Sequence, residues 1–323
     1  MVKRIILSVF TLMVGLAAIG QDAQFSQFYA NPLYLNPALA GSQKCPRVKL
    51  AYRNQYPTLG AYRTFAASYD QFFEGLSGGL GLLALNDVSG DGAYKRTEIS
   101  LMYSYHLVLN RDLALLVGFQ AGFTQLGIDK SKLLFPDQIH PLYGFVYPTG
   151  EVLQENVSYP DFSTGFVLFS ENYYIGGSFH HLTEPENYFI NTGALPMKMT
   201  FHGGASIPIT RSRLARGRET VLNPSILYQA QGETHEQLNY MLSITTKDMI
   251  TAGMSFRHNF NNADAVILML GFSPDKFTIG YSYDYTVSAQ KNGGGGAHEI
   301  TVGYQFPCAP KKKKFKTINC PKF

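Results

Sequence analysis

Large apolar side chains alternate with small or polar ones through Phe277-Thr-Ile-Gly-Tyr-Ser-Tyr-Asp-Tyr285. The same period of two recurs in His298-Glu-Ile-Thr-Val-Gly-Tyr-Gln-Phe306. Because successive side chains of a strand point to opposite faces, both segments predict β-strands with one apolar and one polar face. Segments of about ten residues with this pattern are typical of transmembrane barrel strands. A soluble β-sandwich alternates in the same way, so other features of the chain must decide between the two.

The composition excludes several classes of protein. Of the 323 residues 45% are apolar and 14% aromatic, which is ample surface to bury, so the chain is not disordered. After residue 20 there is no run of about 18 apolar residues, and the mean hydropathy of -0.07 is too low for a helical membrane bundle. The net charge is only +4, and its clearest basic cluster lies in one tail. A nucleic-acid binder spreads basic residues over a working face, so we expect no nucleic-acid partner.

Residues 1–20 have the pattern of a secretory signal peptide. The short basic start Met1–Arg4 precedes the apolar stretch Ile5–Ile19, and polar residues follow Gly20. We expect cleavage after Gly20 and export of the mature chain. An uncleaved anchor is less favoured because the apolar stretch is short for a full span. No cysteine stands directly after the stretch, so a lipoprotein anchor has no acceptor.

Export, a charged fraction of only 15%, and aromatic residues near strand ends together favour an outer-membrane β-barrel over a sandwich. We predict an all-β, antiparallel transmembrane barrel of about 14 strands over residues 46–306. The expected strands are 46–54, 61–70, 78–86, 93–105, 112–124, 162–170, 172–181, 198–209, 219–230, 235–245, 248–258, 263–272, 274–285 and 297–306.

The lengths of the connections predict an orientation. With the first strand running outward, the outer loops include 125–161, 182–197 and 286–296. The inner turns then include Asn110-Arg111, Glu171, Thr246-Lys247 and Ser273. Long outer loops and short periplasmic turns are typical of outer-membrane barrels. The exception is Thr210–Arg218, an inner connection that carries four arginines.

Residues 21–45 precede the first strand, and the part from Gln24 to Gln43 carries no charge. Its two Asn-Pro pairs, Asn31-Pro32 and Asn36-Pro37, initiate turns and block regular strands. Its aromatic and leucine side chains are costly to leave in water, and a lumen wider than that of eight strands has space to fill. We therefore expect this segment at the periplasmic mouth or in the lumen, rather than as a periplasmic arm.

Two sequence blocks resemble a known family. The opening of the PorP/SprF family is similar to Phe25-Ser-Gln-Phe-Tyr-Ala-Asn-Pro-Leu-Tyr-Leu-Asn-Pro-Ala-Leu-Ala-Gly-Ser42 and the following Pro46-Arg-Val-Lys-Leu-Ala-Tyr-Arg-Asn-Gln-Tyr-Pro57. A second family block resembles Gly177-Ser-Phe-His-His-Leu-Thr-Glu-Pro-Glu186, and the lysine-rich ending also fits. These proteins are outer-membrane components of the type IX secretion system of Bacteroidota.

The resemblance covers nearly all of the mature chain and implies a non-enzymatic barrel that helps to secrete or surface-anchor cargo bearing a carboxy-terminal sorting domain. It implies as partners the type IX secretion subunits, the cargo sorting domains, a periplasmic peptidoglycan-associated protein and outer-membrane lipid, and it links the chain to gliding motility. Alternation and composition establish none of this.

The alternative function is a porin or a diffusion channel for apolar solutes. A porin would show charged rings at a constriction and a long loop folded inward. The loop 125–161 is long enough for that role, but it is also rich in Tyr and Phe and could grip a protein instead. The residues alone leave this choice open, and the family resemblance favours the secretion function.

One turn imitates a calcium-binding loop. The EF-hand spacing of oxygen ligands is matched by Asp87, Ser89, Asp91 and Glu98. Strands rather than helices flank this turn, so an ordinary polar hairpin turn is the preferred interpretation and the four residues are a weak calcium candidate. His180 and His181 are neighbours on a predicted strand and should point to opposite faces, which argues against a shared metal ion there.

No catalytic constellation is recognisable. A Gly-x-Ser-x-Gly elbow is missing from the sequence, and Gly79-Leu-Gly81 imitates a dinucleotide loop but lies within a predicted strand and opens no helix. We therefore expect neither an enzyme nor a cofactor.

We expect residues 307–323 to form a basic tail on the periplasmic side. Its four consecutive lysines, Lys311, Lys312, Lys313 and Lys314, are the candidate partner-binding residues. A solvated tail that touches lipid phosphate and a tail that docks on an acidic periplasmic partner remain alternatives.

The three cysteines are Cys45, Cys308 and Cys320, and none lies within a predicted strand. Cys45 precedes the first strand and Cys308 follows the last, and these strands are neighbours in a closed barrel. A disulfide needs Cα atoms within about 7 Å, which adjacent strand ends satisfy, and the periplasm permits disulfides. We favour Cys45–Cys308, then Cys45–Cys320, then Cys308–Cys320, with three reduced thiols as a further alternative.

Overall fold

The computed structural model describes residues 22–60, 62–140, 142–150, 155–186, 194–209, 220–232, 235–246, 249–260, 262–288 and 294–308. Within these residues the chain forms strands and a few helical turns. Among the described helices none is long and apolar enough to cross a membrane. The helical turns are η1 (Phe28–Ala30), α2 (Pro32–Leu35), η2 (Pro37–Leu39), η3 (Pro57–Leu59), η4 (Glu74–Leu76), η5 (Gly90–Gly92), η6 (Lys130–Lys132) and η7 (Pro136–Gln138).

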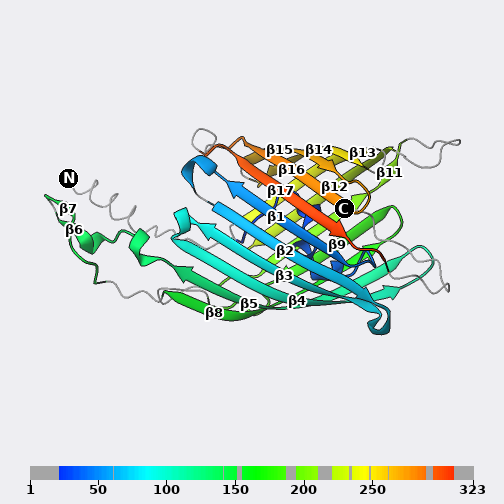
Figure 1. Ribbon diagram of the computed structural model, residues 1–323, viewed down its shortest axis with the longest axis horizontal. Helices are drawn as coiled ribbons and strands as arrows, with labels where there is room; N and C mark the ends of the chain where they lie inside the picture. The colour runs from blue at the N-terminus through cyan, green and yellow to red at the C-terminus, as the bar shows by residue number, and fades with distance from the viewer. Residues whose placement is uncertain are drawn as a thin grey trace.

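Fourteen antiparallel strands form a closed barrel (Figure 1). They are β1 (Arg47–Gln55), β2 (Tyr62–Phe73), β3 (Gly78–Ser89), β4 (Tyr94–Val108), β5 (Ala114–Ile128), β8 (Asn156–Phe169), β9 (Tyr173–His180), β10 (Lys198–Ala205), β12 (Thr220–Gln231), β13 (His235–Thr246), β14 (Ile250–His258), β15 (Ala263–Phe272), β16 (Phe277–Thr286) and β17 (Ala297–Gln305). A short extra strand, β11 (Ile207–Pro208), pairs with β12. A separate hairpin joins β6 (Ile139–His140) to β7 (Gly144–Phe145).

The first and last strands close the barrel. β1 pairs with β17 from Arg47↔Gln305 to Gln55↔Ala297, and neighbouring strands are otherwise joined in chain order. The inward and outward faces follow the predicted alternation, as β4 shows: Ser100 and Ser104 are buried on its inner face, whereas Leu101 is 65% exposed on the outer one. The apolar outer belt and the polar inner face are those of a membrane barrel. The predicted fold class is confirmed.

All fourteen predicted strands are present. The largest errors in their predicted bounds occur at β5 and β8. β5 continues to Ile128 and β8 begins at Asn156, so the predicted loop 125–161 is reduced to residues 129–155. Proline does not stop β8 at Pro160 because the outer part of this strand pairs only with β5 among the described residues. Proline lacks the backbone N–H that would bond to a neighbouring strand, so it is tolerated on a side of the strand that has no neighbour.

The connections define two ends of the barrel. The loop 129–155 and the connections after β9 and β16 lie at one end, which we call the outer end, and the short turn η4 lies at the other, the inner end (Figure 1). β1 runs from the inner to the outer end. The connection Thr210–Arg218, with its four arginines, lies outside the described residues.

Candidate functional site

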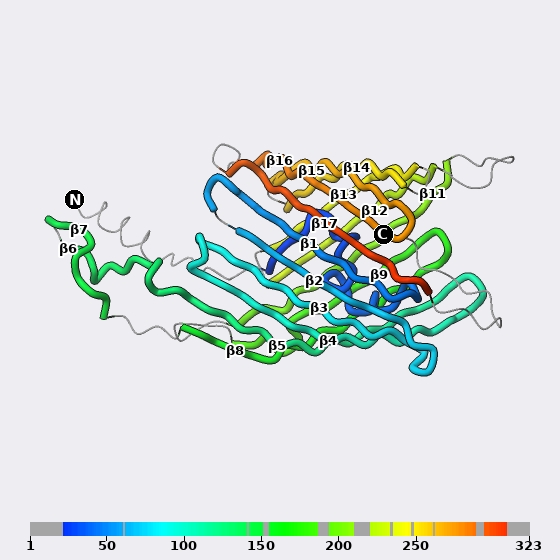
Figure 2. The backbone as a smooth tube through the Cα atoms, in the orientation of Figure 1, coloured from blue at the N-terminus to red at the C-terminus, as the bar shows by residue number. Residues whose placement is uncertain are grey.

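Residues 22–45 lie inside the barrel, and we call them the plug. Figure 2 shows this first part of the described chain as blue coils enclosed by the wall. Ser26, Asn36 and Ala38 are fully buried. The plug begins at Asp22 near the outer end, beside Arg96 of β4, and reaches Cys45 at the inner end. The uncharged segment thus occupies the lumen, one of the two positions that its sequence predicts.

Glycines in the wall create the space for the plug. Gly118 and Gly165 face inward, and a Cβ atom at either position would lie 2.2 Å from a plug atom, the nitrogen of Ala38 or Oδ1 of Asn36 respectively. At Gly79 a Cβ atom would lie 2.1 Å from the carbonyl oxygen of Ala40. These distances are far below van der Waals contact, so only glycine allows the plug and the wall to approach so closely. The apparent dinucleotide loop around Gly79 is therefore part of the plug's seat.

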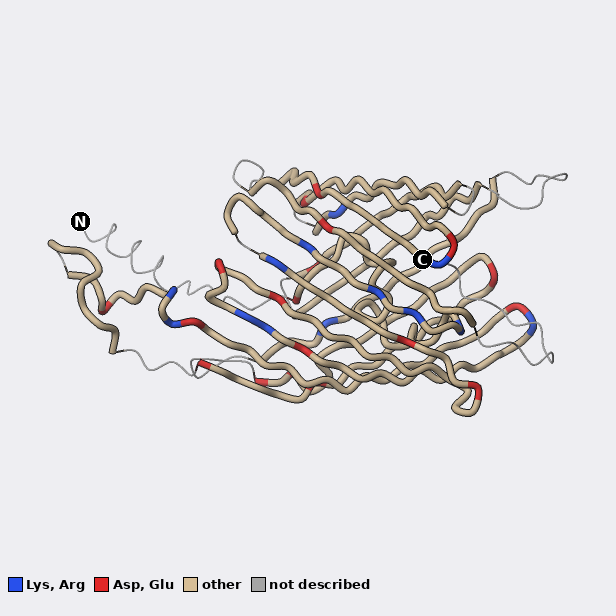
Figure 3. Tube along the Cα trace, in the orientation of Figure 1, with Lys and Arg blue, Asp and Glu red and all other residues tan. Residues whose placement is uncertain are grey.

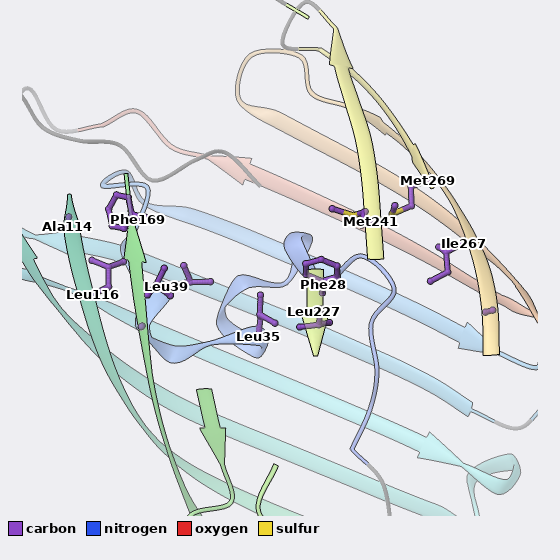
Figure 4. Packing of buried hydrophobic residues seen from close by; sticks show 13 residues of the cluster. Phe28, Leu35, Leu39, Ala114, Leu116, Phe169, Leu227, Met241, Ile267 and Met269 are labelled. Atoms are coloured by element: carbon purple, nitrogen blue, oxygen red, sulfur yellow. The ribbon is translucent and has the colours of Figure 1, made fainter. Parts of the chain in front are cut away.

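An apolar cluster joins the plug to both sides of the lumen (Figure 4). Leu39 packs with Leu116 of β5 and its neighbours, and Phe28 and Leu35 lie with Leu227 of β12 and the strands beyond it. Each fully buried side chain of this size contributes about 2 kcal/mol relative to exposure. The plug is thus held by a core that resembles the core of a soluble domain.

The first anchor of the plug at the outer end is Asp22. Its carboxylate accepts hydrogen bonds from Arg96 and from His181 Nε2 (2.8 Å), and Lys198 Nζ is 3.5 Å away. The other nitrogen of His181 lies 2.7 Å from Asp161 Oδ2. Both ring nitrogens face carboxylates, so both must donate and the ring is cationic. Burial opposes protonation, but Asp22 and Asp161 outweigh it and raise the pKa of His181 to about 9.

In a second outer anchor the wall supplies the carboxylate and the plug supplies the hydrogen-bond donors. The carboxylate of Glu299 on β17 accepts hydrogen bonds from the backbone N–H of Ser26 (2.7 Å) and of Gln27 (3.1 Å). Arg53 of β1 lies between the acids, 3.3 Å from Glu299 and 3.0 Å from Asp284. Fully buried charges are tolerated only when they are paired and hydrogen-bonded in this way. Figure 3 shows that charged residues occur along several strands of the barrel wall. A charge on the lipid-facing side of a strand would be strongly unfavourable.

The inner end of the plug is fixed most firmly. Arg47 Nε donates to Asp70 Oδ1 (2.6 Å), and the other oxygen of Asp70 accepts from the backbone N–H of Gly41 (2.8 Å). The structure joins Cys45 to Cys308 in a disulfide with a Cα–Cα distance of 4.5 Å. This bond links the end of the plug to the end of the last strand, across the β1–β17 seam. Cys320 lies outside the described residues.

The longest outer loop, residues 129–155, extends away from the barrel. Its β6–β7 hairpin lies at the far left of Figure 1, well beyond the rim. The tip is apolar: Leu142 is 82% exposed and Tyr143 75% exposed. Exposed apolar side chains gathered in one segment are typical of a surface that contacts another protein. The described part of this loop does not fold back into the lumen.

Among the described residues, the outer part of β8 is paired on one side only, next to this loop. β5 pairs with β8 over residues 156–169, whereas β9 pairs only with Thr164–Phe169. Beyond them the Leu182 N–H donates to the Phe162 oxygen (3.0 Å). Among the described residues no strand covers 156–161 on that side. An unpaired strand edge can accept an extended segment of another protein.

The carboxylates of the weak calcium candidate have other partners in the structure. Sheet pairing places Asp87 opposite Arg96 and Glu98 opposite Leu85, so the two carboxylates lie at different positions of the β3–β4 hairpin. Asp87 accepts from the Thr64 hydroxyl (2.5 Å), and Glu98 is held by Arg96 at 3.1 Å. Within the described chain no three His, Cys, Asp or Glu residues are grouped to hold a metal ion.

The expectation that His180 and His181 face opposite sides is wrong. β9 ends at His180, and His181 has a left-handed backbone with φ of 59°, which breaks the strand alternation. Both side chains are buried, with ring centroids 6.5 Å apart. His180 lies 3.2 Å from the Ser163 hydroxyl, whereas His181 joins the anchor of Asp22. Lys311–Lys314 and the predicted signal peptide lie outside the described residues.

The charged residues that hold the plug were not identified as functional from the sequence. A usable signal exists for those on the strands, because they occupy inward positions of an alternating pattern. Glu299 and Asp284 stand in the two segments that define the barrel pattern, where an unpaired charge would be costly. Such charges predict a buried partner, but their spacing along the chain does not say which one.

Comparison with known proteins gives one family and several distant folds. The family model of the type IX secretion system membrane protein PorP/SprF matches residues 17–304. No curated protein matches the sequence. The chain is similar to the Acinetobacter baumannii outer membrane protein Omp33, with 7% identity, a TM-score of 0.46, and coverage of 82% of this chain and 100% of that one.

Two further structures show a similar degree of likeness. The CymD monoaromatic hydrocarbon channel has 11% identity and a TM-score of 0.46, over 89% of this chain and 95% of that one. A Pseudomonas aeruginosa FadL homologue has 12% identity and a TM-score of 0.44, over 86% of this chain and 94% of that one. Likenesses this distant carry no inference about function.

Proposed function

Because the chain belongs to the PorP/SprF family of type IX secretion system membrane proteins, we propose that it helps to secrete or surface-anchor cargo through contacts on its outer face and links to periplasmic components through its inner face. The cargo class is a protein with a carboxy-terminal sorting domain. In this function the barrel acts as a membrane anchor and docking platform, and it performs no catalysis.

The proposal rests on two observations together: the plug fills the lumen, and the longest outer loop extends away from the barrel. The plug packs across the lumen, whereas the loop 129–155 presents exposed apolar residues beyond the rim. A porin would use this longest loop as a constriction inside the barrel. A docking protein needs it outside, where its apolar tip and the neighbouring edge of β8 can meet a partner.

Removing the tip of the loop tests the outer contact. Replacement of residues 131–153 by a short Gly-Asn-Gly turn should leave the barrel inserted, because the Ile128 N–H still pairs with the Glu155 oxygen (2.8 Å). We expect surface cargo to fall several-fold, measured by surface immunolabelling of whole cells. The double substitution Leu142→Ser and Tyr143→Ser should reproduce most of the loss.

A matched control separates a specific contact from general loss of outer apolar surface. Leu59 is 63% exposed on the outer turn η3, so Leu59→Ser removes a comparable side chain at another outer connection. We expect it to retain cargo normally. Normal cargo in the loop variants, or equal loss in the control, would exclude the loop as the docking surface.

The basic tail is the proposed contact on the inner face. Changing Lys311, Lys312, Lys313 and Lys314 to Gln should lower co-purification of periplasmic secretion components several-fold at low salt, while insertion stays normal. Added salt should weaken the wild-type contact in the same way, since exposed charge pairs are screened. The single change Lys322→Gln is the control. Unchanged recovery of the quadruple variant at low salt would leave lipid or solvent as the tail's surroundings.

A further inference from the structure

The anchor of Asp22 is a preformed cationic pocket. Arg96 comes from β4, His181 follows β9, and Lys198 begins β10, so three separate parts of the wall converge on one carboxylate. All three cationic side chains are less than 10% exposed, as is Asp22 itself. Arg96 and Lys198 stand near the outer ends of their strands, and His181 directly follows the outer end of β9.

The charges of the pocket balance only when Asp22 is present. Glu98 lies 3.1 Å from Arg96, and Asp161 lies 2.7 Å from His181. For Lys198, Asp22 is the one carboxylate partner within the described residues. Without Asp22 the pocket would keep three cations and two anions, with a buried ammonium group left uncompensated. An isolated buried charge is strongly unfavourable, so the empty pocket demands an anion.

The pocket also contains hydrogen-bonding atoms that the plug leaves without a partner. Arg96 Nε, Gln120 Oε1 and Asp161 Oδ1 are buried without a hydrogen-bond partner among the described residues. These residues line a cavity that has room for about one water molecule. The site is therefore polar, charged and incompletely filled.

Asp22 is held in the pocket mainly by the ion pairs of its carboxylate. The rest is held by the glycine seat, by Glu299 and by the disulfide at Cys45, whereas Asp22 stands at the opposite end from that covalent link. Apart from the contacts of its carboxylate, Asp22 donates its backbone N–H to Gln231 Oε1 over 3.3 Å. The buried apolar residues of the plug begin at Phe25, so Asp22 lies outside its apolar core.

We propose that Arg96, His181 and Lys198 form a carboxylate-binding site, which Asp22 occupies in the structure and which an external carboxylate can take over from the outer side. The ligand is a small organic acid or the terminal carboxylate of a peptide, since both present the same group. The site is independent of the docking function proposed above and does not require cargo.

The test uses the full-length protein in detergent with Asp22→Asn, which removes the resident anion but keeps the size of the side chain. The readout is the midpoint temperature at which the folded band disappears on unheated gels. Sodium formate should raise this midpoint saturably relative to sodium chloride of equal ionic strength, and wild type should not respond. Adding Lys198→Met should abolish the response. An equal effect of chloride, an equal response of wild type, or no response overturns the proposal.

A second measurement works even if Asp22→Asn fails to fold. Ala23→Cys in a Cys320→Ser background places a thiol next to Asp22, and an impermeant maleimide added outside reports its release. Formate should increase the labelling rate at least two-fold, whereas formamide, its neutral counterpart, should not. A tri-alanine peptide with a free carboxyl terminus and its amidated form then separate a peptide source from a small acid. Equal rates with formate and formamide contradict the site.

Discussion

Replacing Gly118 by Val is expected to unseat the plug and open the lumen to ions. A Cβ atom at this position would lie 2.2 Å from the nitrogen of Ala38, which is closer than any relaxed contact. The clash is with backbone, so no rotamer change can relieve it, and overpacking of a close-fitting core costs about 1–3 kcal/mol. We expect single-channel conductance in planar bilayers to rise several-fold over the wild-type protein.

The control for this variant is Gly303→Val. Gly303 also lies on an inner face, but its nearest neighbour to an added Cβ atom is Thr278 at 3.6 Å, an ordinary contact. It should insert and stay closed. If Gly118→Val fails to assemble, deletion of residues 24–41 provides a second variant, because it removes the plug without touching the wall. A wild-type protein that conducts as well as the deletion would contradict a sealing plug and favour the channel alternative.

The double substitution of Tyr304 and Phe306 by Asp is expected to abolish assembly of the barrel. The ring of Tyr304 lies 4.8 Å from that of Phe277 and 4.7 Å from that of Phe306, so one aromatic cluster ends the last strand. Each such pair contributes about 1 kcal/mol beyond its buried area. Carboxylates at these positions also place charge on the outer face, where it is unfavourable in lipid.

The readout is the heat-modifiable band of membrane-extracted protein, which we expect to be lost in the Asp variant. The double change to Leu is the matched control, since it removes the rings but keeps apolar side chains, and it should still insert. Tyr304 pairs directly with Val48 on the first strand, so the Asp variant also disturbs the seam. Normal insertion of the Asp variant would show that this strand end does not face lipid.

The buried charges give the barrel an interior that differs from an open pore. Arg53 contacts both Glu299 and Asp284, and Arg257 shares Asp284 at 3.0 Å. In a water-filled channel such charges would be free to act on passing solutes. Here these charged side chains form ion pairs with one another and hydrogen bonds with the plug. This agrees with a barrel whose exposed surfaces, rather than its lumen, serve its function.

The amino-acid sequence by itself determined the strands, their faces and the family. Strand alternation is a local property, because a period of two depends only on consecutive residues, and segments such as Phe277–Tyr285 carry it without help from the rest of the chain. The uncharged segment before the first strand likewise predicts its own burial, because its aromatic and leucine side chains are costly to expose to water. The errors were local too: the expected strand began at residue 162 whereas β8 begins at Asn156, and His181 left the alternation through its left-handed backbone.

Only the tertiary structure decided which inward residues meet one another and the plug. Ser26 reaches Glu299 across 273 positions of sequence, and Asp22 reaches His181 across 159. Such pairs depend on barrel closure and on the register of every strand between them, because a shift of one residue would turn each inward side chain outward. No single segment holds that information. The carboxylate pocket and the glycine seat therefore emerge only when the wall closes around the plug.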